Sequence, residues 1–434
     1  MRFKWILILE ALLAGAYVSL TRGLFVIYLV SIGNRIEDIS FVVLVSAVAS
    51  LLIGILLYRR PNFIVSKVKL KLTIFHASER IMWLLIPLST SSLAISTIYS
   101  AYIIFSSFIS AFMSFAIYGS LTEADIKDVT AKRSATFGIS SILGFALGVF
   151  LLAFLPPDEK FTYIFYLGFA IGLMSTFLIA FLNMKHLEGA TFPQVTEQPE
   201  KIFSASSFFV VLLASGNLLG IVWMPYVMNY LRGPDFLAAS MSLAATLSSI
   251  IASLVWRNKA FKILRLSLVL NMLAPLLIWF TSWPVLHVPI NVYTAFTFTG
   301  SNFLGMFLFA KYNKWFGPVK SSILLVILGN VAQLMAAPLG MFLKEDYIVA
   351  FAAIFAIKAA ATILAILVIP EVAVVPEDEA RTYSYVLYNN SIMGYRIAVE
   401  VSRETILTTL RLLALSLVFV AMYVIYRVLW ILMA

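Results

Sequence analysis

Apolar segments about twenty residues long recur along the whole chain, and short polar or charged stretches separate them. A helix needs about 20 apolar residues to cross a bilayer, so each segment is a candidate membrane span. The segments are closely spaced, which leaves short connections and no extended polar domain. The pattern predicts thirteen spans, near residues 5–32, 41–58, 72–89, 95–117, 135–156, 161–183, 206–230, 236–256, 263–283, 286–310, 321–343, 347–369 and 408–434.

Composition agrees with this pattern. The chain of 434 residues is 62% hydrophobic and 12% charged, with a mean hydropathy of +0.98, which is typical of an all-α polytopic membrane protein. The first apolar segment is too long for a cleavable signal peptide and lacks a small-residue cleavage site, so we expect it to remain as the first span.

The net charge of +10 orients the protein and does not indicate a nucleic-acid partner. With the N-terminus inside, 23 Lys and Arg residues fall on inner segments and four on outer loops. This positive-inside bias supports the number of spans. It predicts an integral protein of the cytoplasmic (plasma) membrane, with the N-terminus inside and the C-terminus outside. The oligomeric state stays open.

The spans divide into two halves and an appendage. We predict an N-terminal six-helix bundle (1–183), a cytoplasmic linker (184–205), a C-terminal six-helix bundle (206–370), a cytoplasmic amphipathic segment (371–407) and an extra transmembrane helix (408–434). A shift of 200 residues places Leu12 on Leu212 and Gly33 on Gly233. Six spans per half put both copies in the same orientation, as in a parallel repeat with a pseudo-two-fold axis.

Residues 1–370 resemble the major facilitator superfamily. The plan of 6+6 helices carries the resemblance, together with the stretches "GILLYRRPN" and "KDVTAKRSATFGISSILGFALG". In the first stretch Gly54 and Arg59 match a loop motif of the family, whereas Tyr58 stands where the family has an acid. In the second, Asp128 and Arg133 match a loop of the family. The resemblance implies that these four matching residues serve gating.

The resemblance also implies that spans one, four, seven and ten line a central cavity. At ~100° per residue, each of these spans has a polar or aromatic stripe on one face. Ser, Thr and Asn side chains can instead hold helices together in lipid, and for any single residue that alternative stays open. The candidate substrate-pathway residues are Arg22, Tyr17, Thr21, Tyr99, Tyr102, Ser106, Ser110, Trp223, Tyr226, Asn229, Asn291 and Asn302.

Charges within the predicted spans are few. Arg22 lies near the middle of the first span, where an unpaired charge costs at least about 2.5 kcal/mol. It either faces a water-filled cavity and attracts an anionic substrate, or it pairs with a neighbouring helix or an acid such as Glu79. Glu10 is the candidate proton-coupling group, unless it only reaches the inner surface. Glu79 and Arg80 are expected to pair with groups on other helices, and Lys358 receives no functional role.

Other chemistry has little support in the sequence. There is no cysteine, no phosphate-binding glycine loop and no histidine pair at metal-ligand spacing. The acidic "TEADIKD" stretch is typical of a solvated charged loop. We therefore expect neither enzyme activity, nor a cofactor, nor a bound metal.

The sequence predicts a secondary active or facilitative transporter that moves a small organic solute by alternating access. An anionic or carboxylate-bearing substrate is favoured. The alternatives are an exporter of amphipathic drugs or lipids, and a non-transporting membrane enzyme or scaffold.

Overall fold

The computed structural model describes residues 2–89, 91–189, 202–256, 259 and 261–368, and throughout these ranges the chain is built from helices. The predicted segments 371–407 and 408–434 lie outside the described residues, as does most of the predicted linker. Within the described ranges, nine helices are long and apolar enough to cross a membrane, and the protein is an integral membrane protein.

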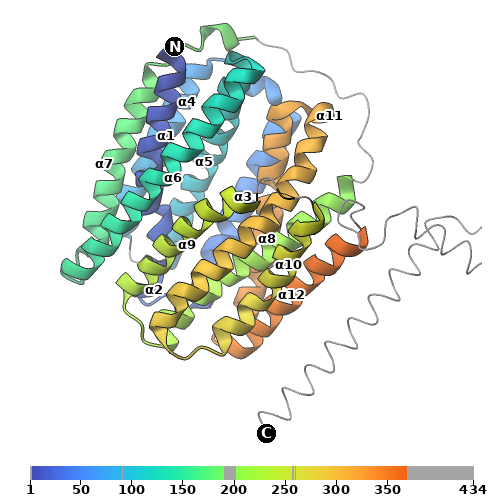
Figure 1. Ribbon diagram of the computed structural model, residues 1–434. Helices are drawn as coiled ribbons and strands as arrows, with labels where there is room; N and C mark the ends of the chain where they lie inside the picture. Colours follow the sequence, from blue (N-terminus) through green and yellow to red (C-terminus); the bar gives the residue numbers. More distant parts are fainter. Residues whose placement is uncertain (1, 90, 190–201, 257–258, 260, 369–434) are drawn as a thin grey trace, which may run out of the picture.

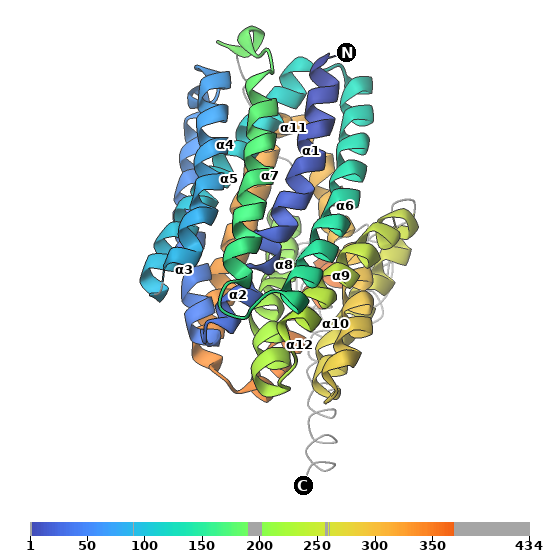
Figure 2. The ribbon, with the colours of Figure 1, turned by 90° about the vertical axis from the view of Figure 1, so that its left-hand side faces the viewer.

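The first half contributes six crossings. They are α1 (Arg2–Leu20) continued by η1 (Arg22–Leu24) and α2 (Phe25–Ser31), then α3 (Ile36–Arg59), α4 (Val68–Leu85), α5 (Ser92–Ser120), α6 (Glu123–Phe154) and α7 (Lys160–Ala180). Short 3-10 turns at Pro61–Phe63, Ile86–Leu88 and Lys185–Leu187 lie at the ends of these crossings. Figure 2 shows α4, α7, α1 and α6 as neighbours across one face of this half.

The second half repeats the plan. It consists of α8 (Ile202–Pro225) with the π-helical turn η5 (Tyr226–Tyr230), α9 (Asp235–Trp256), α10 (Phe261–Trp279), the 3-10 turn η6 (Pro284–Leu286), α11 (His287–Leu343) and α12 (Tyr347–Val368). In Figure 1 the blue-to-green helices and the yellow-to-orange helices form two groups, and α3 packs against α11 of the other group.

One helical element, α11, covers the predicted tenth and eleventh spans. Its 57 residues would extend about 85 Å if straight, far more than one crossing. Both ends instead lie beside the same tyrosine. The ring of Tyr226 is 5.7 Å from His287, the first residue of α11, and 5.2 Å from Tyr347, just beyond its last turn. The helix therefore turns back and crosses twice.

The sequence analysis placed the "TEADIKD" stretch in a loop, and the structure corrects this. α6 begins at Glu123, and the Thr122 side chain accepts a hydrogen bond from the backbone N–H of Asp125, as an N-terminal cap does. Asp128 therefore lies in the second turn of a helix, where it pairs with Lys132 one turn later at 2.8 Å.

The halves pack against each other along α3 and α11, and they also share an apolar core at the end opposite the N-terminus, which is the predicted outer end. A single apolar core there includes Ile27 and Tyr28 of the first half with Trp223 and Val227 of the second. Towards the other end the apolar core divides into two clusters. One belongs to the second half, and the other belongs to the first half together with Ile323 of α11.

Candidate solute site

The first helix of each half is irregular towards the predicted outer end. α1 stops at Leu20, and the chain passes through a 3-10 turn before α2 begins. At this break the built Cβ of Gly23 would lie 2.6 Å from the Phe145 ring, so a larger residue there would have to displace that ring. In the second half, Pro225 precedes the π-helical turn η5. Interrupted helices near the midplane of transporters expose backbone and side chains to a binding site.

Arg22 begins the 3-10 turn of the first half, and its side chain is exposed. The hydroxyls of Tyr99 and Tyr102 on α5 lie close enough to interact with its guanidinium group. Aromatic packing fixes both tyrosines, because Tyr99 stacks on Phe25 with ring centroids 4.2 Å apart and Tyr102 meets Trp83 at 4.9 Å. The structure thus brings three predicted pathway residues together.

Glu79 is paired with its neighbour Arg80, and Arg22 forms no salt bridge with it. The Tyr17 hydroxyl donates to Glu79 at 2.8 Å, and the guanidinium group of Arg80 lies 4.5 Å from the centre of the Tyr17 ring. The sequence analysis had assigned Glu79 and Arg80 to partners on other helices. They have such partners, since Tyr17 of α1 bonds Glu79 and Arg80 bonds Ser175 of α7, and they also contact each other.

A second ion pair lies near the first, towards the N-terminus. Glu10 of α1 is 4% exposed and accepts a hydrogen bond from Arg133 of α6 at 2.9 Å. His76 of α4 is 3.7 Å from the other oxygen of Glu10, and its ring also bonds Arg80 at 3.0 Å. The two pairs thus form one buried network that joins α1, α4 and α6.

The charges in this network balance. Two carboxylates, Glu10 and Glu79, meet two arginines, Arg80 and Arg133. Arg22 lies next to the network but has no carboxylate within 4.0 Å among the described residues. Among the described residues at this network, Arg22 is therefore a cation whose charge no carboxylate balances.

A cavity of about 390 Å³ lies in the second half, a volume within the range of sites for small organic ligands. Trp223 and Asn291, two predicted pathway residues, line it together. The complete lining is Leu213, Gly216, Asn217, Leu219, Gly220, Trp223, Met224, Asn291, Thr294, Ala295, Phe298 and Lys358.

The sequence analysis gave Lys358 no role, yet it lines this cavity. It lies on α12, which the family plan places at the periphery, and its side chain is 2% exposed. The sequence did contain one signal for a role of Lys358, because an ionisable residue in the middle of an apolar span often marks a functional site. Its long side chain reaches the cavity from a helix that the family resemblance assigned to the periphery.

A buried hydrogen-bond chain next to the cavity was also missed. The indole N–H of Trp223 donates to Nδ1 of His287 at 3.0 Å, and Nε2 of His287 donates to the carbonyl of Thr281 at 3.1 Å. These partners fix the imidazole as the neutral Nε2–H tautomer. They also hold the indole ring in one orientation at the cavity wall.

The remaining predicted pathway residues lie elsewhere. Thr21 is fully buried and bonds the carbonyl of Tyr17, while Tyr226 packs in an aromatic cluster with Tyr347 at the predicted outer end. Asn229 is exposed in the π-helical turn. Ser106 and Asn302 are half-buried.

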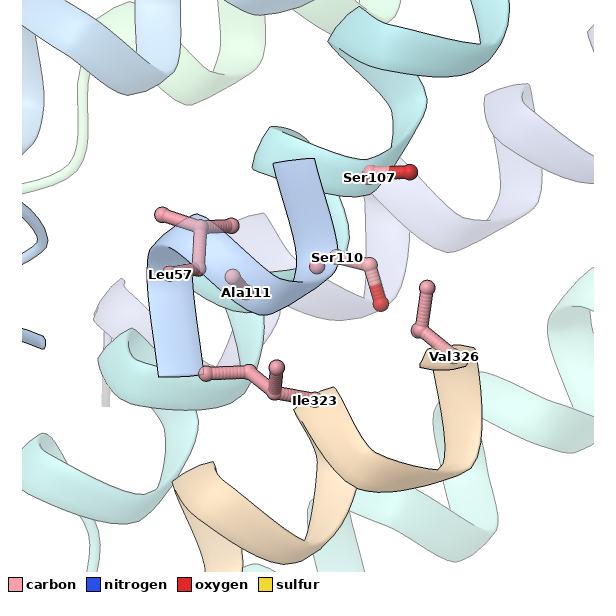
Figure 3. A pocket seen from close by; sticks show the side chains of 7 residues that line it. Leu57, Ser107, Ser110, Ala111, Ile323 and Val326 are labelled. Carbon is pink, nitrogen blue, oxygen red and sulfur yellow. The ribbon is translucent and has the colours of Figure 1, made fainter. Parts of the chain in front are cut away.

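Figure 3 shows a second, much smaller pocket between the halves, where Ser110 of α5 points toward Val326 of α11. Its volume of about 10 Å³ is enough for one water molecule and too small for an organic solute. Gly54 also lines it, and a Cβ built on Gly54 would lie 2.9 Å from Ile327 of α11. Arg59, the other motif residue on α3, has an exposed side chain at the end of the helix.

Among the residues that the structure describes, no group of three or more His, Cys, Asp or Glu side chains could hold a metal ion.

No protein-family model matches the chain, and no curated protein matches it. Several solved structures are similar to the chain in fold. The chain is similar to a bacterial homologue of the iron transporter ferroportin in an inward-facing state, with 14% identity, a TM-score of 0.63, and coverage of 84% of this chain and 97% of the other. It is similar to the nucleoside transporter NupG, with 15% identity, a TM-score of 0.59, and coverage of 84% and 96%. It is also similar to a bacterial metal transporter, with 14% identity, a TM-score of 0.58, and coverage of 84% and 97%. The described part of the chain therefore has the 6+6 helix fold of major-facilitator-like membrane proteins.

Proposed function

We propose that the protein is a secondary active or facilitative transporter that moves a small organic solute across the membrane by alternating access. The observation that carries this proposal is the cavity of about 390 Å³ beside Trp223 and Asn291 in a bundle of two six-helix halves. The shared core at one end and the divided cores towards the other suit rocking of the halves about a central site. The fold similarity to nucleoside and metal transporters supports the same class.

Purified protein in proteoliposomes tests this proposal. We expect counterflow of at least one class of labelled solute from a panel of organic anions, neutral nucleosides, amphipathic cations and lipids. Flux of amphipathic drugs or lipids alone would favour the exporter alternative. Turnover of a lipid with no flux of any solute would favour a membrane enzyme.

Arg22 supports an anionic or carboxylate-bearing substrate as the favoured class. It is exposed at a helix break, two tyrosine hydroxyls lie beside it, and the nearby acids are already paired. Arg22→Lys keeps the charge but loses the planar fork, whereas Arg22→Gln loses both. We expect a graded loss of affinity for organic anions, by about tenfold or more for Arg22→Gln.

Arg60→Gln is the matched control, because Arg60 is exposed at the end of α3. Its affinity should equal that of the wild type. An Arg22→Gln protein that binds anions normally, or that fails to accumulate in the membrane, would make Arg22 a structural residue.

We further propose Glu10 as the proton-coupling group. Its carboxylate is buried and bound to Arg133 of a different helix, so taking up a proton requires that ion pair to open. Glu10→Gln should abolish accumulation driven by a pH gradient and leave counterflow intact. Undiminished proton-driven uptake would exclude Glu10, with sodium coupling and facilitated diffusion as the alternatives.

A further inference from the structure

Lys358 is a buried lysine at the wall of the cavity in the second half. It lies midway along α12, its side chain is 2% exposed, and it lines the cavity together with Trp223 and Phe298. Neither Trp223 nor Phe298 carries a negative charge that could balance an ammonium group. The centre of the Phe298 ring lies 5.7 Å from the ammonium nitrogen, at the edge of the cation–π range.

One hydrogen bond orients the ammonium group. Nζ of Lys358 donates to Oδ1 of Asn271 on α10. The amide of Asn271 cannot flip without losing two hydrogen bonds, because its nitrogen donates to Oγ1 of Thr297 at 3.0 Å and to the carbonyl of Thr294 at 3.3 Å. Asn271 is 1% exposed, so its oxygen is a fixed acceptor for the lysine.

This arrangement leaves Lys358 without a counter-charge. An ammonium group has three N–H donors, and the described residues supply one hydrogen-bond acceptor, which is neutral. Among the described residues no carboxylate lies within 4.0 Å of Nζ. Buried charges in proteins are ordinarily paired, and ionisable groups inside membrane spans mark substrate and ion pathways.

The rest of the cavity wall suits the body of an organic molecule. Trp223 and Phe298 supply aromatic surfaces, and Asn217 and Thr294 supply polar groups. The amide nitrogen of Asn291 is already bound to the carbonyl of Met241 at 3.0 Å, so it is held in place. A ligand with an apolar body and one acidic group would complement this wall and neutralise the lysine.

We propose that Lys358 binds the carboxylate, sulfonate or phosphate group of an organic anion in this cavity, with Asn271 as the residue that positions its ammonium group. This proposal rests on the proposed function. It assigns the same substrate class, organic anions, to the cavity of the second half that Arg22 supports in the first half. It assigns a binding role to the twelfth helix.

The test uses the full chain, purified in detergent, and three probes of nearly equal shape: 2-naphthoate, 2-naphthalenesulfonate and the neutral 2-naphthamide. Titration of thermal stability gives an apparent Kd for each probe. We expect at least one anion to bind the wild type tenfold or more tightly than the amide. Lys358→Met should remove that preference and leave amide binding unchanged.

Asn271→Asp is the second variant, and it keeps the lysine. The new carboxylate would lie where Oδ1 now accepts the ammonium proton, so it would pair with Lys358 and repel a ligand anion. We expect the same loss of at least tenfold in anion affinity. Lys69→Met, which removes an exposed lysine on α4, is the matched control and should bind as the wild type does.

The proposal is overturned if no anion binds the wild type more tightly than the amide, or if Lys358→Met and Asn271→Asp both retain the preference. Its failure can be told apart from that of the proposed transport. Binding that depends on Lys358 without flux in proteoliposomes would reject transport and keep the site. Flux of organic anions that Lys358→Met leaves unchanged would keep transport and reject the site.

Discussion

At the scale of single residues, most buried charges of the first half neutralise one another. Glu79 and Arg80 are each 4% exposed and paired. Removing one partner of a buried ion pair leaves a charge with no compensation, which costs about 3–5 kcal/mol in proteins, whereas an exposed pair contributes about 0–1 kcal/mol.

We therefore expect Glu79→Gln and Arg80→Met each to lower the melting temperature of the protein in detergent, and the double variant to lower it by less than the sum. The exposed pair Asp128–Lys132 supplies the control, and Asp128→Asn should change the melting temperature little. Additive effects of Glu79→Gln and Arg80→Met would show that the two side chains are not coupled.

At the scale of elements, small residues set how closely the helices approach. α1 and α6 are in extensive contact, and Gly144 of α6 lies against Ala16 of α1. A Cβ built on Gly144 would lie 2.9 Å from the carbonyl oxygen of Ala16. Backbone atoms cannot give way as the end of a side chain can, so any larger residue must separate the two helices.

Gly144→Ala should destabilise the protein by about 1–3 kcal/mol, the usual cost of overpacking, measured as a lower melting temperature or a lower denaturant midpoint. Gly220→Ala is the control. It makes the same chemical change in α8, where nothing lies within 4 Å of the built Cβ. Equal losses in the two variants would mean that close packing of α1 on α6 is not the cause.

At the scale of the whole molecule, contacts between the halves close the predicted outer end. Lys160 of α7 forms a salt bridge with Asp235 of α9, and Arg35 lies 3.6 Å from Glu345. α3 packs against α11 at the same end, where the built Cβ of Gly340 would lie 3.3 Å from the Cβ of Ser40. Alternating access requires this end to open.

The chain contains no cysteine, so any disulfide that forms must join the introduced cysteines. A Cβ–Cβ separation of 3.3 Å is close to that of disulfides, and Ser40→Cys with Gly340→Cys should form one under oxidation. We expect this bond to abolish flux in proteoliposomes, and reduction to restore it.

The control disulfide lies within one half. The built Cβ of Gly168 on α7 would lie 3.4 Å from the Cβ of Leu20 on α1, so Leu20→Cys with Gly168→Cys should also form a disulfide. In the proposed rocking of whole halves, α1 and α7 would move together, so flux should persist. Full flux with the Ser40–Gly340 positions oxidised would contradict opening at this end.

Local physical chemistry explains why the sequence by itself determined the helical class and the arrangement of two similar halves. Hydropathy over about twenty residues decides whether a segment crosses a bilayer, and that quantity needs no knowledge of distant contacts. Periodicity likewise placed Tyr99 and Tyr102 on one face of α5. The structure shows that this face lies beside Arg22. Two of the twelve residues that line the cavity, Trp223 and Asn291, were predicted as pathway residues from the same pattern.

Only the tertiary structure decided which charges pair and where the backbone departs from a regular helix. At the break after Leu20, Gly23 packs against Phe145 of α6, and the partners of Glu10 lie on α4 and α6, more than 60 residues away in the chain. Lys358 reaches the cavity because a lysine side chain is long enough to extend from a peripheral helix to Asn271. Periodicity assigns faces to a helix, but the partner that satisfies a buried charge is fixed by the packing of helices that lie far apart in the chain.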